Sequence, residues 1–202
     1  MKLSRAMMIM FCLGAALIFS GASMAEEITT ITDSLAATDP TQLGRLSRNG
    51  IAQDWIGTEH VPGVINPATT YNYKAYEITI PSNAPFVQIS VDSLSAFTFV
   101  SVYADSYNPA SLATNWLGDA GTSGNFFGID PLFFQVIAPG STLWIVVNNT
   151  SPGLGIGDPY SILVEGFADS EFTEPVPEPA TMLLLGTGLV GLIAARRRKQ
   201  AA

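Results

Sequence analysis

The chain has 202 residues with 17 acidic and 9 basic side chains, and its net charge of −8 hides an uneven distribution. Residues 26–174 carry 16 of the acidic residues against only Arg45, Arg48 and Lys74, which gives this stretch a net charge of −13. Such an acidic stretch repels phosphate backbones, so the composition excludes nucleic acid as a partner. A stretch of this length is enough for one domain with a sizeable core.

Residues 1–25 have the organisation of a secretory signal peptide. Two basic residues precede an apolar segment at 6–19, and a small-x-small cleavage site ends at Ala25, before Glu26. We therefore expect a signal-peptide helix that is removed between Ala25 and Glu26 during export. An uncleaved N-terminal anchor is the alternative interpretation.

The only cysteine of the chain, Cys12, lies inside this apolar segment. Removal of the signal peptide would therefore leave a mature chain without cysteine. Such a chain has no disulfide, no thiol nucleophile and no cysteine-based zinc site.

Residues 26–70 show little periodicity. Residues 28–32 are β-branched and predict at most a short strand, and residues 42–51 predict a brief helical turn or no regular element. We expect this segment to be weakly regular and to pack on the scaffold formed by the residues that follow.

From residue 71 onward the pattern is that of a β protein. Short segments alternate apolar and polar residues and are separated by turns rich in Gly, Pro and Asn, without an amphipathic helix of three turns. Residues 71–168 therefore predict an all-β, antiparallel, jelly-roll-like β-sandwich. The predicted strands cover residues 73–80, 86–91, 97–103, 132–137, 142–148 and 160–167.

The C-terminal part combines a linker, an apolar segment and a basic end. Residues 169–179 form an acidic, proline-containing linker, residues 180–195 carry no charge, and residues 196–202 begin with a basic cluster. The apolar segment predicts a transmembrane helix whose basic flank stays on the cytoplasmic side. It is a short span, because 16 residues rise only about 24 Å against a hydrocarbon core of about 30 Å.

The order of these parts resembles the PEP-CTERM sorting signal of Gram-negative bacteria. The resemblance rests on Val176, Pro177, Glu178 and Pro179, on the apolar span, and on Arg196, Arg197 and Arg198. It implies processing by a membrane-embedded exosortase. It further implies export through the inner membrane, transient anchoring by the C-terminal helix, and delivery to the cell surface or extracellular matrix. The alternative is an ordinary C-terminal anchor that nothing cleaves.

Residues 35–168 show a second resemblance, to bacterial pre-peptidase C-terminal-type domains. It rests on the Phe-x-Phe-Val-x-Val-Tyr segment at 97–103, the Ala-Pro-Gly-Ser-Thr-Leu-Trp-Ile-Val-Val segment at 138–147 and the Tyr-Ser-Ile-Leu-Val-Glu-Gly segment at 160–166. It implies a jelly-roll-like sandwich of the kind appended to secreted proteases and surface proteins. No protease domain precedes the segment in this sequence, so an accessory role to a peptidase is not assumed.

Candidate catalytic groups are few. His60 is the only histidine, and no Gly-x-Ser-x-Gly elbow accompanies it. Asp105, Asp119, Asp130 and Asp158 lie in predicted inter-strand loops, where paired carboxylates could act on a glycosidic bond. Nothing in the sequence pairs them, and solvated loops are the simpler interpretation. We therefore assign no catalytic residue.

A calcium site is the alternative use of these aspartates. Hard cations prefer carboxylate and carbonyl oxygens, and Asp119, Asp130 and Asp158 are the candidate ligands. No Asp-x-Asp-x-Asp-Gly loop is present. We therefore expect no obligatory cofactor, with calcium as the one metal to be tested.

Aromatic side chains in or beside loops suggest a carbohydrate-binding surface. Trp55, Tyr107 and Trp116 are candidates for stacking on sugars, although packing in the core is the simpler role for large side chains. Arg45 and Arg48 could contact an acidic polymer, but in so acidic a domain internal ion pairs are the simpler expectation.

Together these features predict a secreted, non-enzymatic surface or matrix protein associated with exopolysaccharide or biofilm. An envelope enzyme resembling glycoside hydrolases, or a calcium-dependent carbohydrate-binding module, is the alternative hypothesis.

Overall fold

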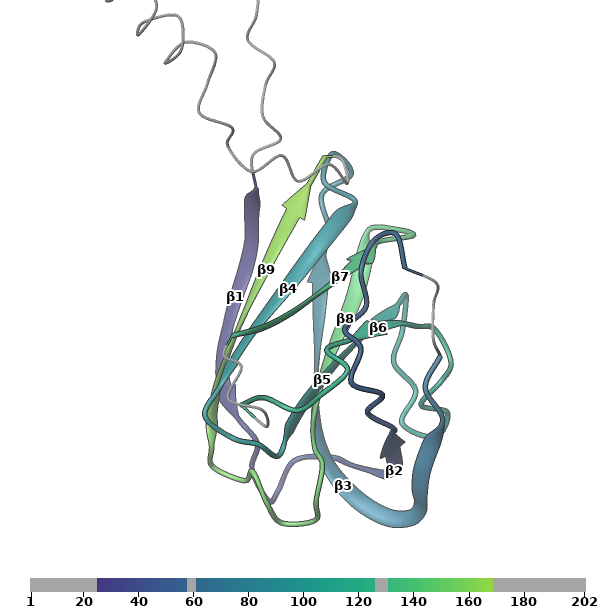
Figure 1. Ribbon diagram of the computed structural model, residues 1–202, viewed down its shortest axis with the longest axis vertical. Helices are drawn as coiled ribbons and strands as arrows, with labels where there is room; N and C mark the ends of the chain where they lie inside the picture. Colours follow the sequence, from purple (N-terminus) through teal and green to yellow (C-terminus); the bar gives the residue numbers. More distant parts are fainter. Residues whose placement is uncertain (1–24, 58–60, 126–130, 169–202) are drawn as a thin grey trace, which may run out of the picture. The chain divides into compact units, whose positions relative to one another are not determined.

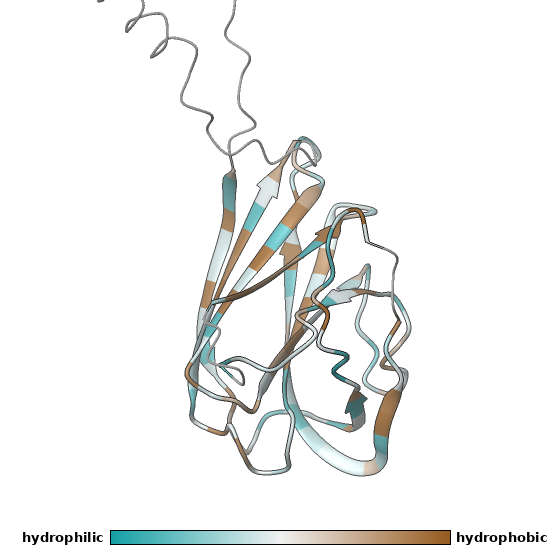
Figure 2. Ribbon diagram, in the orientation of Figure 1, coloured by the Kyte–Doolittle hydropathy of each residue, from teal (hydrophilic) through white to brown (hydrophobic). Residues whose placement is uncertain are grey.

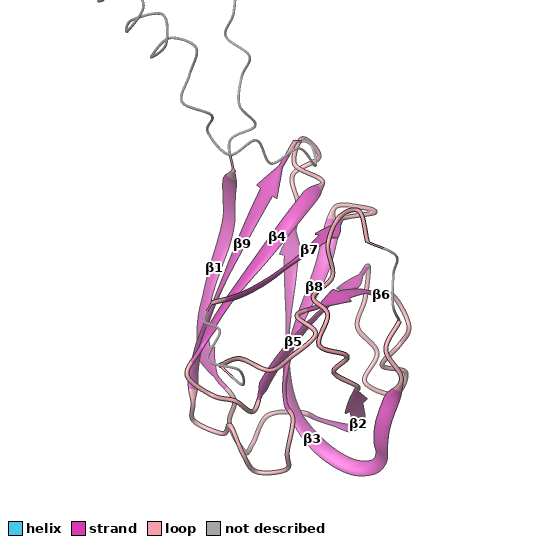
Figure 3. Cartoon of the chain, viewed as in Figure 1, coloured by secondary structure: helices cyan, strands magenta, loops and turns pink. Residues whose placement is uncertain are grey.

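The computed structural model describes residues 25–57, 61–125 and 131–168. Within these ranges all regular structure is β-strand (Figure 3), and none of the described residues forms a helix long and apolar enough to cross a membrane. The expected signal-peptide and transmembrane helices lie outside the described residues. The strands are β1 (Glu26–Ser34), β2 (Thr41–Leu46), β3 (Val64–Thr79), β4 (Phe86–Ser93), β5 (Thr98–Ala104), β6 (Trp116–Asp119), β7 (Leu132–Ile137), β8 (Thr142–Asn149) and β9 (Pro159–Phe167).

The strands form two antiparallel sheets that face each other (Figure 1). One sheet has the order β1-β9-β4-β7 and the other the order β2-β3-β8-β5-β6. From β3 to β9 the chain passes repeatedly from one sheet to the other, as in a jelly roll. The prediction of an all-β antiparallel sandwich is confirmed, and each of the six predicted segments contains or overlaps a strand.

The main core lies between the two sheets and follows the alternation in the sequence (Figure 2). On β8, Leu143, Ile145 and Val147 are fully buried in this core, as the period of two requires. Ile162 and Val164 of β9 meet them from the opposite sheet. Fully burying one such aliphatic side chain stabilises the fold by about 1.5–3 kcal/mol.

A second apolar cluster covers the outer face of the five-stranded sheet. Val146 of β8 points to this face, and it packs with Leu46, Phe99, Tyr103, Leu112 and Trp116. Leu112 belongs to the connection between β5 and β6, which folds back over its own sheet. This cluster explains why β8 is buried on both faces.

The segment 26–70 differs from the expectation of weak regularity. It contains β1, β2 and the first residues of β3, and β1 and β2 form edge strands of the two sheets. The predicted helical turn at 42–51 is instead strand β2 with an extended continuation. The Thr-rich β1 pairs with β9, and a bulge at Gly44 disturbs the alternation of β2, so neither strand shows a clean period of two.

The two open sides of the sandwich are closed differently. Between β1 and β3, Lys74 forms an ion pair of 2.7 Å with Asp33, and the Tyr76 hydroxyl donates to the same carboxylate. The Tyr76 hydroxyl also lies 2.6 Å from the Tyr160 hydroxyl. The hydrogen bond from Lys74 holds the pKa of Asp33 below its usual value, although burial opposes it. The other side, between β6 and β7, is closed by a loop segment that also forms the candidate site.

Candidate functional site

A depression of about 140 Å³ opens at the side of the sandwich where β6 and β7 meet. One wall is the segment between β2 and β3, and the other is β6. The lining residues are Asn49, Ile51, Ala52, Gln53, Asp54, Gly57, Trp116 and Asp119. Half of the lining residues, Asn49, Gln53, Asp54 and Asp119, are therefore polar or acidic.

The segment 50–53 runs between the two sheets and hydrogen-bonds to both. The amides of Gly50 and Gln53 donate to the carbonyls of Gly121 and Asp119, at 2.9 and 3.0 Å. On the other side, the amide of Gln135 in β7 donates to the carbonyl of Gln53 at 2.8 Å. This segment therefore links the five-stranded sheet to the four-stranded sheet through its backbone.

Glycines on the β6 side allow this close approach. A Cβ atom on Gly121 would lie 2.4 Å from the backbone carbon of Ile51, and Gly121 has a φ of +69°. A Cβ atom on Gly118 would lie 2.7 Å from Val136 and 2.9 Å from the side chain of Gln53. A side chain at Gly121 would push the linking segment away from β6.

Asp119 is the buried acidic group of the site. Only 3% of the residue is exposed, and burial raises the pKa of its carboxyl group to about 6. The Gly121 amide donates to its Oδ1 atom at 2.7 Å, which opposes the shift by favouring the ionised form. The pKa of the Asp119 carboxyl group therefore lies well above the ordinary value for an aspartate.

Trp116 adds an N–H donor beside this carboxyl group. The indole of Trp116 is 6% exposed, and its Nε1 atom makes no hydrogen bond of normal geometry to any described residue. The N–H is close enough to Asp119 to favour the ionised carboxylate. A donor next to an acceptor suits a hydroxyl group or a water molecule, which can both accept and donate.

The arrangement does not suit a calcium ion. A metal ligand must present a lone pair, whereas the Trp116 N–H presents a hydrogen. Of the three predicted ligands, Asp119 lies at the end of β6, Asp158 lies immediately before β9, and Asp130 falls outside the described residues. No group of three His, Cys, Asp or Glu side chains in the described ranges could hold a metal ion.

Asp54 brings a second carboxylate to the rim of the depression. It is exposed, and its Oδ1 atom accepts hydrogen bonds from the amides of Ile56 and Gly57 within its own turn. Asp54 was not predicted from the sequence, because an aspartate three residues before a glycine is the ordinary composition of a turn. Asp54 and Asp119 line the same depression because the linking segment, residues 50–53, runs along β6, and no sequence pattern predicts this approach.

The predicted aromatic ligands all make structural contacts within the domain. Tyr107 packs against the rings of Tyr73 and Tyr103, with centroids 5.2 and 4.8 Å away, and its hydroxyl donates to the Gln42 side chain. Trp116 belongs to the outer apolar cluster as well as to the depression. For these two residues the simpler interpretation, packing, describes the observed contacts.

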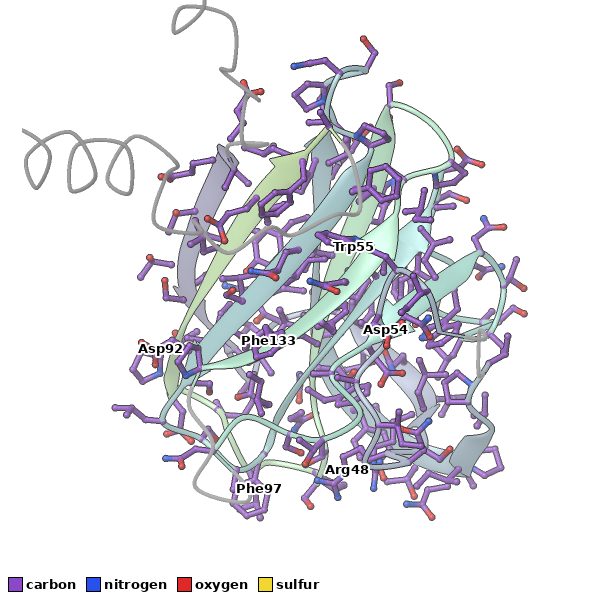
Figure 4. The ribbon with its side chains drawn as sticks, turned by 45° about the horizontal axis from the view of Figure 1, so that its top comes forward. Arg48, Asp54, Trp55, Asp92, Phe97 and Phe133 are labelled. Carbon is purple, nitrogen blue, oxygen red and sulfur yellow. The ribbon has the colours of Figure 1, made fainter. Side chains whose placement is uncertain are left out.

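Trp55 is half-buried against the four-stranded sheet (Figure 4). Its Nε1 atom donates to the backbone carbonyls of Val87 and Val136, at 3.3 and 3.1 Å. Its ring meets Phe86 and Phe167 edge to face, at centroid distances of 5.7 and 5.4 Å. Trp55 thus fixes the end of the linking segment to β4 and β7.

The other candidates lie away from this depression or outside the described residues. Among the described residues, ion pairs are formed by Lys74 with Asp33 and Asp39. The expected ion pair of Arg45 is therefore not observed in this part of the chain. Arg45 is buried, and its Nε atom has no hydrogen-bond partner among the described residues. Arg48 donates to the Ser123 hydroxyl, and burial lowers its pKa, with a further contribution from the charge of Arg45. His60 falls outside the described residues.

The remaining predicted carboxylate, Asp105, is exposed at the end of β5 with a positive φ of 57°. Its backbone carbonyl accepts the Trp144 indole N–H at 3.0 Å. Its observed contact is therefore a structural one, and it does not belong to the lining of the depression.

By its fold, the described part of the chain is a two-sheet antiparallel β-sandwich with an acidic depression at one side. The comparison with protein families matches residues 175–199 to the PEP-CTERM protein-sorting motif. The chain therefore carries the sorting signal of a PEP-CTERM protein, which implies an exported, exosortase-processed extracellular protein. No curated protein matches the chain. The resemblance of residues 35–168 to pre-peptidase C-terminal-type domains stays a prediction.

Proposed function

We propose that this protein is a non-enzymatic component of the cell surface or extracellular matrix that associates with exopolysaccharide. The match of residues 175–199 to the sorting motif is the observation that carries this proposal. An acidic sandwich with a net charge of −13 over residues 26–174 supports it, because such a domain stays soluble beside an anionic cell surface.

In this proposal the C-terminal segment acts only during export. The apolar residues 180–195 hold the chain in the membrane, and the basic residues that follow stop translocation. The exosortase then removes the segment at or near Pro177-Glu178-Pro179, and residues 26–174 remain outside the cell. A short span suits a temporary anchor better than a permanent one.

The mass of the mature protein in its native host tests this part of the proposal. We expect loss of both the signal peptide and the basic C-terminus. Replacing Glu178 and both flanking prolines by alanine should leave the tail attached while the signal peptide is still removed. A wild-type protein that retains Arg196–Lys199 would reduce the tail to a plain anchor and contradict the proposal.

Association with polysaccharide is tested by sedimentation with exopolysaccharide from the same host. We expect the mature chain to sediment with the polymer and to release no reducing sugar. This outcome would separate a binding module from a hydrolase, since a hydrolase releases product continuously.

One observation favours the second candidate, an envelope glycoside hydrolase. Asp54 and Asp119 line the same depression, and the raised pKa of Asp119 is the property of a general acid. The near-complete burial of Asp119 and the small volume of the depression favour the binding role instead. Release of reducing sugar that disappears in both Asp119→Asn and Asp54→Asn would establish the hydrolase and refute the binding module.

A further inference from the structure

The two outer faces of the sandwich are covered to different extents. The outer face of the five-stranded sheet carries the apolar cluster with Leu112 and Trp116 described above. On the four-stranded sheet, Phe133 of β7 is 61% exposed and Asp92 of β4 is exposed (Figure 4). Phe133 is therefore a large aromatic side chain that a regular strand presents to solvent.

The strand register places polar groups beside Phe133. Ser90 of β4 pairs with Phe133 of β7, and one row further Gln88 pairs with both Gln135 of β7 and Glu165 of β9. All five side chains point to the outer face, because their neighbours along each strand are buried in the core: Val87, Ile89 and Val91 on β4, Phe134 and Val136 on β7, and Val164 on β9. We call Phe133, Ser90, Gln88, Gln135 and Glu165 together the Phe133 platform.

The polar row of the platform is ordered in advance. The Gln135 amide donates to the Gln88 carbonyl oxygen at 2.9 Å, and the Gln88 amide makes a long contact of 3.5 Å with Glu165. Each side-chain amide still has donor or acceptor capacity that these contacts do not use. The row thus places amide and carboxylate groups side by side on three strands.

The dimensions of the platform match a sugar. Residues on one face of a strand repeat about every 7 Å, and three strands span about 10 Å. A sugar ring over Phe133 would place its hydroxyl groups above the Gln88–Gln135 row. Apolar C–H faces of sugars stack on aromatic rings, while their hydroxyls pair with amides and carboxylates.

The charged residues of this face are all acidic, and this favours an uncharged polymer over an anionic one. Glu165, Asp92 and Glu27 are its charged residues, and the three basic residues of residues 26–174 lie on β2, β3 and the loop after β2 rather than on these strands. A polyanion such as a uronate chain would be repelled. The amide row needs no counter-charge, and it suits uncharged hydroxyls.

We propose that the Phe133 platform binds a neutral polysaccharide, with one sugar ring stacked on Phe133 and its hydroxyls paired with Gln88 and Gln135. This assignment rests on the proposed function and names the surface and the polymer class that serve it. The platform lies on the outer face of the four-stranded sheet, whereas the Asp119 depression lies between β6 and the linking segment.

The test uses host exopolysaccharide separated by anion exchange into a neutral and an acidic fraction. Residues 24–170, which form one compact unit with its own cores, are the protein sample. We expect binding to the neutral fraction that changes little with salt. Phe133→Ala should weaken it about tenfold, which is the scale of one lost stacking contact.

Two variants control the result. Leu43→Ala removes a side chain of equal exposure, 62%, from β2 of the other sheet, and it should bind like the wild type. Gln135→Leu keeps the side-chain volume and the backbone bond to Gln53 but removes the amide, and it should also weaken binding. An unchanged melting temperature shows that each variant is folded.

The outcomes separate the platform from the proposed function. Binding that Phe133→Ala and Gln135→Leu leave unchanged, or binding to the acidic fraction alone, overturns the platform while association with polysaccharide stands. Binding to neither fraction overturns the polysaccharide part of the proposed function together with the platform.

Discussion

Replacing Asp119 by Asn should change how stability depends on pH. Asp119 is almost fully buried, and burial raises its pKa from 3.8 to about 6. The folded state therefore holds a proton that the unfolded chain has already lost at pH 5. Its contribution to stability is present below pH 3.8 and is lost as the pH rises through 6. An Asn side chain keeps an acceptor for the Gly121 amide but never ionises.

The size of the effect follows from the shift. A displacement of about 2 pKa units corresponds to about 3 kcal/mol in total, of which about 2.4 kcal/mol falls between pH 4 and pH 7. The free energy of unfolding of Asp119→Asn minus that of the wild type should therefore be about 2.4 kcal/mol higher at pH 7 than at pH 4. Any difference in packing between Asp and Asn does not depend on pH, so it cancels in this comparison.

Urea unfolding of residues 24–170 at several pH values measures the effect. The low pKa of Asp33 acts in the opposite direction, since its contribution is lost as the pH falls, but it is the same in both proteins. The difference between wild type and variant therefore isolates Asp119. A difference that stays constant from pH 4 to pH 7 would refute the burial argument.

The remaining predictions concern the contacts that close the sandwich. Gly121→Ala should lower the melting temperature far more than Gly153→Ala, because both glycines have positive φ but only Gly121 faces a backbone atom at 2.4 Å, while Gly153 has nothing within 4 Å. The conformational cost alone, about 1–2 kcal/mol, is common to both, so equal losses would contradict the close approach. Trp55→Phe should lower the free energy of unfolding in urea by about 1 kcal/mol, since two backbone carbonyls lose the indole donor. Lys74→Met should lower the free energy of unfolding by no more than about 1 kcal/mol, and by less at high salt, because the ion pair with Asp33 is partly exposed. A loss of stability that does not depend on salt would show that the packing of Lys74 matters more than its charge.

The strands from β3 onward, apart from β6, were predictable because their environment is regular. On β8 and β9 the alternate residues meet one core, so the period of two survives in the sequence. β6 was not predictable, because its four residues include Gly118 and all but Leu117 are buried. β2 was obscured by the bulge at Gly44, whose positive φ of 74° breaks the alternation.

The candidate site was predictable only in its parts. Asp119 and Trp116 were each selected, one as a metal ligand and one as a sugar ligand, but the sequence offers no sign that they share a depression. They meet there because Gly118 and Gly121 let residues 50–53 pass against β6. Contacts of this kind depend on a long-range approach between backbones, and that approach leaves only isolated glycines in the sequence.

In this domain the residues that close the sandwich are different from those of the Phe133 platform. The segment 50–53 closes the sandwich through backbone hydrogen bonds, so the side chains that face solvent on the four-stranded sheet are not needed for closure. Phe133 of β7 lies opposite Ser90 of β4 at a position that is 61% exposed. A sandwich that is closed at its sides by backbone hydrogen bonds can therefore carry an aromatic ring and a row of amide side chains on one face, and in the proposed function the sorting signal at residues 175–199 directs this domain to the outside of the cell.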